Sequence, residues 1–181
     1  MTGRLVYVMG PSGAGKDTLL AFARQRLYGS RVVFAHRYIT RAADAGGENH
    51  VHLSHEEFGV RSDLGLFALQ WSSHGMHYGI GIEIESWMAR GMTVVVNGSR
   101  EYLEQALTRY PSLTAVHIDA QPDVLAARLA ARGRETLDEV RARLARRVPF
   151  AVPPQVTLAM IDNSGALEEG GRALLDVLTP C

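Results

Sequence analysis

The stretch Gly10-Pro11-Ser12-Gly13-Ala14-Gly15-Lys16-Asp17-Thr18 decides the fold of this 181-residue chain. It follows the apolar run 5–9, which predicts a buried strand, and it precedes residues 19–27, which have the pattern of a helix. A strand, a glycine-rich loop, a lysine and a helix in this order are typical of a phosphate-binding loop. Backbone N–H groups of such a loop surround a di- or triphosphate, and the helix N-terminus adds partial positive charge. We therefore predict that residues 10–18 bind ATP phosphates, with Lys16 reaching the β- and γ-phosphates; the alternative is a turn that only joins strand to helix.

The residue after the lysine is Asp17, where such loops usually carry a Ser or Thr whose hydroxyl binds Mg²⁺. A carboxylate is a good Mg²⁺ ligand but repels bare phosphate, so Asp17 fits chiefly if the metal lies between it and the nucleotide. Thr18 lies about 100° further round the helix and can contact another phosphate. We therefore predict Asp17 and Thr18 beside Mg²⁺. The alternative is that Asp17 is only a favourable acid in a first helical turn.

The composition indicates one globular domain, with 46% hydrophobic and 21% charged residues. Lys plus Arg and Asp plus Glu number 19 each, so no overall charge attracts nucleic acid. No apolar run approaches the ~20 residues that span a membrane, and the first residues do not resemble a signal peptide. Cys181 is the only cysteine, which excludes an internal disulfide and fits a reducing compartment. We expect a cytoplasmic protein with no nucleic-acid or membrane partner; its oligomeric state stays open.

Strand and helix signals alternate along the chain, which is typical of an α/β fold with a parallel sheet. After the first strand and helix, further strands are expected at residues 31–35, 93–96, 113–118 and 156–161. Further helices are expected at residues 83–90, 100–109, 122–131, 136–147 and 166–178.

Two segments of the chain have the character of substrate and lid modules. Residues 36–81 are rich in Gly and His, lack a long helical period and follow the second strand, where open α/β sheets bind ligands. We predict that they form a small substrate-binding module. Residues 132–136 lie between two predicted helices that carry arginines, and we predict that they form a lid. Lid arginines neutralise the charge of a transferring phosphoryl group and exclude water, although an Arg-rich helix pair can also be a solvated surface.

The motifs together resemble the guanylate kinase group of nucleoside-monophosphate kinases. The segments that carry the resemblance are GPSGAGK at 10–16, the turn at Arg41, HGMHYG at 74–79, RLAARGRETLDEVRARL at 128–144 and DNSGAL at 162–167. The resemblance covers essentially the whole chain. It implies a single domain, 1–181, with a three-layer P-loop NTPase fold, a parallel sheet, a small substrate-binding insertion and an Arg-rich lid. It also implies that Arg132 and Arg143 bind the transferring phosphates, and we add Arg134, from the lid, to these catalytic candidates.

The chain departs from this group where guanine is recognised. A Glu that hydrogen-bonds guanine in the group is matched here by Leu69, and a Thr that contacts the base is matched by Ile80. Unpaired guanine N–H groups would cost ~1–3 kcal/mol each. The second phosphate-binding Arg of the group's TRxPRxGE run is also missing from residues 40–50. We expect the fold to be kept and the guanine pocket to be lost.

The segments in which the chain departs from this group are similar to those of another family, the ribose 1,5-bisphosphate phosphokinases (PhnN) of phosphonate breakdown. They are GKDT at 15–18, AHRYITR at 35–41, GGENH at 46–50, YGIG at 78–81 followed by Glu83, and VNGSR at 96–100. The resemblance makes Asp17 a family feature. It implies transfer of the γ-phosphoryl group of ATP to ribose 1,5-bisphosphate, which gives 5-phosphoribosyl 1-diphosphate and ADP.

A bisphosphate acceptor needs several cations in the substrate module. Arg37, Arg41 and Arg100 are our candidates, with His36 and His50 as weaker ones. Asn97 is expected at the end of a strand, where it could hold ribose hydroxyls or Mg²⁺, and Tyr78 could stack or donate to a phosphate. Local hydrogen bonding of Asn97 and core packing of Tyr78 are the alternatives.

Three other functions stay open at this stage. The chain could be a nucleoside-monophosphate kinase, although Leu69 and Ile80 argue against GMP. It could be a catalytically silent kinase-like module that binds an anionic or phosphorylated protein, although Gly15 and Lys16 argue against that. It could also be a nucleotide sensor that binds ATP without acceptor-dependent turnover.

Overall fold

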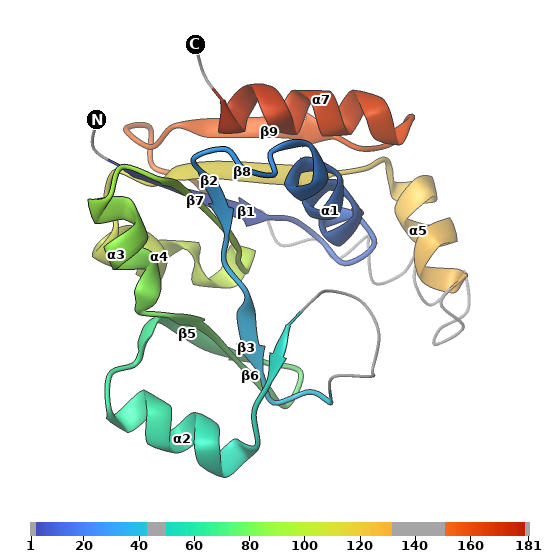
Figure 1. Cartoon of the computed structure of the whole chain (residues 1–181). Helices are drawn as coiled ribbons and strands as arrows, with labels where there is room; N and C mark the ends of the chain where they lie inside the picture. The colour runs from blue at the N-terminus through green and yellow to red at the C-terminus, as the bar shows by residue number, and fades with distance from the viewer. Residues whose placement is uncertain (1–2, 43–49, 132–150, 180–181) are drawn as a thin grey trace.

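A parallel five-stranded sheet forms the centre of the computed structural model, which describes residues 3–42, 50–131 and 151–179. All neighbouring strands of this sheet are parallel. Their order across the sheet is β2 (Val32–Phe34), β7 (Thr93–Asn97), β1 (Arg4–Met9), β8 (Thr114–Asp119) and β9 (Leu158–Asp162). Helices cover both faces, so the predicted three-layer α/β arrangement is confirmed (Figure 1).

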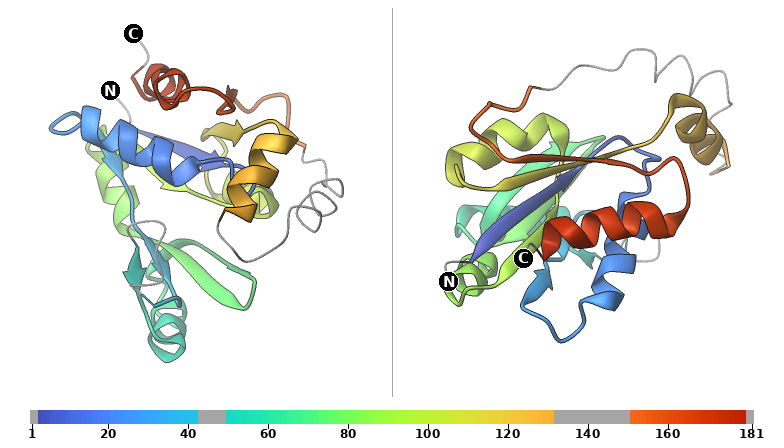
Figure 2. Two further views of the ribbon diagram at one scale, coloured as in Figure 1. Left: turned by 90° about the vertical axis from the view of Figure 1, so that its right-hand side faces the viewer. Right: turned by 90° about the horizontal axis from the view of Figure 1, so that it is seen from above.

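Alternation along the central strand supplies both cores of the molecule. Side chains of a strand point to opposite faces in turn, so Leu5, Tyr7 and Met9 enter one apolar cluster while Val6 and Val8 enter the other. The cluster of Val6 includes buried residues of α1 (Lys16–Arg26), α5 (Pro122–Ala130) and α7 (Leu167–Leu178). The cluster of Tyr7 includes residues of α3 (Glu83–Ala89) and α4 (Leu103–Arg109), which follows the short helix η1 (Arg100–Tyr102). The right-hand view of Figure 2 shows α1 (blue) and α7 (red) side by side.

A second, four-stranded sheet follows β2 in the chain and lies below the first in Figure 1. Its order is β4 (Val51–His52), β3 (Arg37–Ile39), β6 (Met76–Gly81) and β5 (Phe67–Ser73). It also carries the nine-residue helix α2 (His55–Asp63), which the sequence analysis missed. Ser54 caps this helix by accepting a hydrogen bond from the Glu57 N–H at 3.0 Å.

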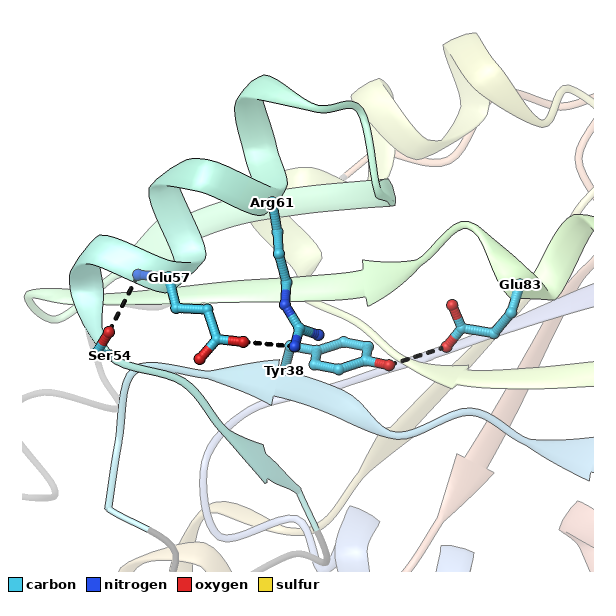
Figure 3. Close-up of polar contacts among 5 residues, drawn as sticks. All are labelled: Tyr38, Ser54, Glu57, Arg61 and Glu83. Carbon is cyan, nitrogen blue, oxygen red and sulfur yellow. Dashed lines mark hydrogen bonds and ion pairs between the residues drawn. The ribbon is translucent and has the colours of Figure 1, made fainter.

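The two faces of the second sheet have different partners. On the outer face, Tyr38 and Phe67 pack with Phe58 of α2. Arg61 pairs with Glu57 and lies over the Tyr38 ring, while the Tyr38 hydroxyl donates to Glu83 of α3 at 3.4 Å (Figure 3). On the inner face, side chains of β5 and β6 enter the same apolar cluster as Tyr7. The second sheet therefore shares a core with the first.

In the parallel sheet and its helices, the observed elements lie close to the expected ones, whereas the strands β3 to β6 of the second sheet were not expected. The strand expected at 156–161 is shifted to β9 (158–162), and the helix expected at 100–109 begins with a 3₁₀ turn. The helix expected at 136–147 and the lid at 132–136 lie outside the described residues. Among the residues that the structure describes, no helix has the length and apolar character needed to cross a membrane.

Candidate functional site

The glycine-rich loop between β1 and α1 takes a shape that side chains would prevent. Gly15, which caps α1, has a left-handed conformation with φ 82° and ψ 22°. A Cβ on Gly15 would lie 2.4 Å from the amide nitrogen of Asn163, and one on Gly10 would lie 1.9 Å from the Ile118 carbonyl oxygen. Both positions therefore require glycine. The loop is pressed against its neighbours and opens toward a cavity.

Lys16 lies over this loop from the first turn of α1. Its Nζ donates hydrogen bonds to the carbonyl oxygens of Gly10 at 2.8 Å and Pro11 at 3.1 Å. An ammonium group has three donors on a flexible stem, so the same nitrogen can reach from the loop carbonyls to a phosphate oxygen. The geometry fits the predicted contact with the β- and γ-phosphates.

Asp17 points toward the cavity beside the loop and is held by a neighbouring strand. Asn97, at the end of β7, donates from Nδ2 to Asp17 Oδ1 at 3.0 Å. Asp17 and Thr18 line the cavity, whereas Asn97 is 5% exposed and does not. An oxygen donor set of carboxylate and hydroxyl suits Mg²⁺, which usually keeps waters and phosphate oxygens as its other ligands. Asp17 and Thr18 therefore fit a magnesium ion that also contacts nucleotide phosphates, and Asn97 orients the carboxylate.

Two residues that were not predicted as part of the site, Asn163 and Arg128, support the loop. The Asn163 amide donates to the Ala14 carbonyl at 2.7 Å, and Arg128 donates to the Asn163 carbonyl at 2.9 Å. Asn163 is 5% exposed, and Nη1 of Arg128 is buried 3.7 Å from the Cβ position of Gly15. The stretch DNSGAL at 162–167 was a sequence signal for this region, but the pairing of Asn163 with Ala14 was not predictable from it.

The loop opens into a cavity of about 340 Å³ at the carboxyl ends of β1 and β7. Of the predicted site residues, it is lined by Gly10, Pro11, Ser12, Gly13, Gly15, Lys16, Asp17, Thr18, Arg37, Arg41, Tyr78 and Arg100. Trp71, Ser73, His74, Ser99 and Glu101 also line it, and the sequence analysis had not assigned them to the site. Ala14 and Asn97 lie behind the lining. Arg132, Arg134 and Arg143 lie outside the described residues, so their roles stay predictions.

Two stacked aromatic rings, those of Trp71 and Tyr78, border the cavity. The Tyr78 and Trp71 rings are stacked 5.5 Å apart with an angle of 5° between their planes, and Trp71 packs on Tyr102 at 5.6 Å. The guanidinium of Arg37 lies 5.2 Å from the centre of the Tyr78 ring. Tyr78 thus both packs on the core and borders the cavity, so the two alternatives for this residue coexist.

Arg41 reaches the cavity from the segment that follows β3. Its carbonyl oxygen accepts hydrogen bonds from two histidine rings, from Nε2 of His50 at 3.0 Å and from Nδ1 of His52 at 2.9 Å. A carbonyl can only accept, so both ring nitrogens must carry protons. The Arg41 Nε is buried and has no hydrogen-bond partner among the described residues. His50 therefore anchors an arginine, and His36 borders a different groove, beside β2.

Leu69 and Ile80 face each other on β5 and β6 and are buried, with exposed fractions of 4% and 0%. Both belong to the apolar cluster that contains Tyr7. A base edge needs hydrogen-bond partners at its binding site, and two buried aliphatic side chains provide none. Their placement fits the expected loss of a guanine pocket.

Known proteins give independent evidence of the family. No family model matches the chain. The ribose 1,5-bisphosphate phosphokinase PhnN of Burkholderia pseudomallei is 62% identical over 175 residues, which cover 97% of this chain and 95% of the relative. The protein of the same name from Thiobacillus denitrificans is 53% identical over 178 residues, with 98% and 93% coverage.

A solved guanylate kinase supports the fold. The crystal structure of guanylate kinase from Anaplasma phagocytophilum matches with a TM-score of 0.70 over 98% of this chain and 85% of that one. The two sequences are 17% identical, so this likeness concerns the fold alone. The resemblances found in the sequence are thereby confirmed. By its identity to these relatives over almost its full length, the chain belongs to the ribose 1,5-bisphosphate phosphokinase PhnN family.

Proposed function

We propose that the chain transfers the γ-phosphoryl group of ATP to ribose 1,5-bisphosphate, forming 5-phosphoribosyl 1-diphosphate and ADP. The observation that carries the proposal is that one cavity is lined both by the phosphate-binding loop and by three arginines from other segments. Lys16 and the loop line this cavity, and so do Arg37, Arg41 and Arg100. A triphosphate donor and a second, highly anionic substrate fit this distribution of charge.

The chemistry that this site must support is modest. An oxygen of the acceptor's 1-phosphate attacks the γ-phosphorus of ATP, and the bond from that phosphorus to the β–γ bridging oxygen breaks. The attacking oxygen is ionised near neutral pH, because the second pKa of a phosphate monoester is about 6. No strong general base is therefore needed, and catalysis depends on positioning and on stabilising negative charge.

Each part of the site has a share in that stabilisation. Lys16 and the loop amides hold the β- and γ-phosphates. Mg²⁺, when bound beside Asp17 and Thr18, would neutralise charge on the phosphate oxygens. The resemblance assigns Arg132 and Arg143 to the phosphoryl group in transfer, and we propose that Arg134 acts with them. Tyr78 and Asn97 complete the proposed site residues, and Asn97 acts by orienting the Asp17 carboxylate.

A nucleoside-monophosphate kinase is the nearest competing function. Burial of Leu69 and Ile80 in the shared core speaks against guanine as a substrate. A silent binding module is a second competitor. The complete loop, with Lys16 over it and Asp17 held by Asn97, speaks against the loss of catalysis.

Replacement of the single lysine tests the proposed function. Lys16→Ala is expected to lower kcat for ribose 1,5-bisphosphate by roughly 10²–10³-fold, because it removes a preorganised charge from the transition state. Release of ADP in a coupled assay measures the rate, and urea unfolding checks that the fold persists. Arg26→Ala, which removes an exposed cation from the other end of α1, is the matched control and is expected to keep full activity. Full activity of Lys16→Ala would contradict the proposal.

A further inference from the structure

A bisphosphorylated sugar carries two anions at opposite ends of its ring, and one of them does not react. The reacting phosphate must lie next to the γ-phosphate of ATP, and therefore near Lys16 and the loop. The other phosphate must be bound elsewhere in the same cavity. The question is which cation of the cavity takes it.

Arg37 has the surroundings of a fixed anion receptor. It lies in β3, opposite Ile80 of β6, and its guanidinium rests on the Tyr78 ring. That ring is in turn stacked on Trp71, which is 8% exposed. The stack limits the movement of the planar guanidinium, which offers paired N–H donors that match a phosphate. Such preorganisation favours a specific contact over a general attraction.

The position of Arg37 in the cavity is set by the second sheet. It belongs to β3 and lines the cavity together with Tyr78 of the neighbouring strand β6. Arg41 follows four residues later, beyond the end of β3, and such a segment spans at most about 14 Å. The two arginines thus line the same cavity from separate points, as two phosphates on one sugar require.

The row of side chains that contains Arg37 favours an anion over a base at this point. Arg37 pairs with Ile80, and Ile80 pairs with Leu69, so the three lie side by side across three strands. Ile80 and Leu69 are buried and apolar. The polar group that this row presents to the cavity is a guanidinium, and its natural ligand is a phosphate.

We propose that Arg37, backed by the Tyr78–Trp71 stack, binds the second, non-reacting phosphate of the acceptor and thereby selects bisphosphorylated over monophosphorylated sugars. Arg41 then binds the reacting phosphate. This inference rests on the proposed function, since it concerns the same acceptor. It makes Arg37 a specificity-determining residue.

Two sugar monophosphates separate the ends of the acceptor experimentally. Ribose 5-phosphate keeps the non-reacting phosphate, and ribose 1-phosphate keeps the reacting one. Each is measured as a competitive inhibitor of turnover of ribose 1,5-bisphosphate. In Arg37→Met, kcat/KM for ribose 1,5-bisphosphate is expected to fall roughly 10- to 100-fold, as for loss of a charged hydrogen bond. The inhibition constant of ribose 5-phosphate is expected to rise by a similar factor. Inhibition by ribose 1-phosphate is expected to stay as in the wild type.

Arg61→Met is the matched control. Arg61 also lies over a tyrosine ring, that of Tyr38, but on the outer face of the same sheet, outside the cavity. Its replacement is expected to change none of the three constants. Arg37→Lys, which keeps the charge, is expected to recover part of the inhibition by ribose 5-phosphate and serves if Arg37→Met does not fold.

The inference is overturned if Arg37→Met weakens inhibition by both monophosphates equally, or weakens inhibition by ribose 1-phosphate alone. It is also overturned if Arg41→Met, rather than Arg37→Met, selectively weakens ribose 5-phosphate. Failure of the proposed function is a different result, because the wild-type enzyme itself would then show no turnover of ribose 1,5-bisphosphate.

Discussion

Tyr7 shows how one buried side chain can fix a loop of the site. Its hydroxyl donates to the Ser99 carbonyl and accepts from the Ser99 N–H, both at 2.9 Å. Its ring fills the space beside Gly98, where an added Cβ would lie 2.1 Å from a ring carbon. Burial raises the pKa of the Tyr7 hydroxyl far above its ordinary value, so the hydroxyl stays a donor at any working pH. Through Ser99, Tyr7 sets where Arg100 enters the cavity.

Tyr7→Phe is expected to lower the free energy of unfolding by about 1–3 kcal/mol, because two partly buried backbone groups of Ser99 lose their partner. It is also expected to raise KM for the sugar more than KM for ATP, since the loosened loop carries Arg100. Urea unfolding and steady-state kinetics measure the two effects. Tyr28→Phe, at a tyrosine that is 94% exposed, is the control. Unchanged stability and KM in Tyr7→Phe would show that Tyr7 is not a positioning residue.

At this scale, the sequence predicted the residues with a local motif and missed those without one. Residues 10–18 were predicted from the spacing of a phosphate-binding loop, and the structure places all of them except Ala14 along one cavity. The supports of the loop and its neighbours were not found, because Asn163 meets Ala14 and Tyr7 meets Ser99 only after the chain has folded. For Asn97, contact with ribose hydroxyls or Mg²⁺ and local hydrogen bonding were both open, and the structure shows a hydrogen bond from its Nδ2 to Asp17 Oδ1.

Helices α3 and α4 are joined by a small polar cluster on the surface. Glu85 of α3 accepts from Arg109 at 2.8 Å and from the Tyr110 hydroxyl at 2.9 Å. The hydrogen bond from Arg109 lowers the pKa of Glu85 below its ordinary value of 4.5. Burial, and then the hydrogen bond to Glu85, raise the pKa of Tyr110 to about 12. The cluster therefore holds Glu85 ionised and Tyr110 protonated at neutral pH.

Glu85→Gln is expected to lower the free energy of unfolding at pH 7 by about 0.5–1 kcal/mol, a small value because the pair is half exposed to water. A carboxyl whose pKa is lowered on folding stabilises the protein above its ordinary pKa, and this is lost as pH falls through the lower, folded value. The difference in free energy of unfolding between Glu85→Gln and the wild type should therefore vanish in acid, as measured by urea unfolding across pH. Glu104→Gln, on α4, is the control. A difference that persists in acid would rule out the ionised carboxylate as its source.

Among the elements, those of the parallel sheet and its helices were predictable, whereas α2 and the strands of the second sheet were not. The central strands alternate between two apolar clusters, so their residues show a clear period. Helix α2 buries only Phe58 among its nine residues, and β4 has two exposed residues, so neither leaves a periodic signal. Their presence depends on the capping by Ser54 and on pairing with β3.

Across the whole molecule, the site lies where two sheets meet. The parallel sheet supplies the phosphate-binding loop and Asp17, and the second sheet supplies Arg37 and Tyr78. The two sheets share the apolar cluster of Tyr7, Trp71 and Ile80, so the elements that carry the loop and Arg37 pack on one core. The two ends of the chain are also tied together, because Arg4 donates to the carbonyl oxygens of Val177 and Leu178 at the end of α7.

The most direct test of the account is ³¹P NMR of the purified protein with ATP, Mg²⁺ and ribose 1,5-bisphosphate, beside a sample that contains GMP instead. The account predicts new diphosphate signals of 5-phosphoribosyl 1-diphosphate, with ADP, in the first sample and no GDP in the second. Formation of GDP without turnover of the ribose bisphosphate would contradict it, and would mean that Leu69 and Ile80 do not mark the loss of guanine recognition.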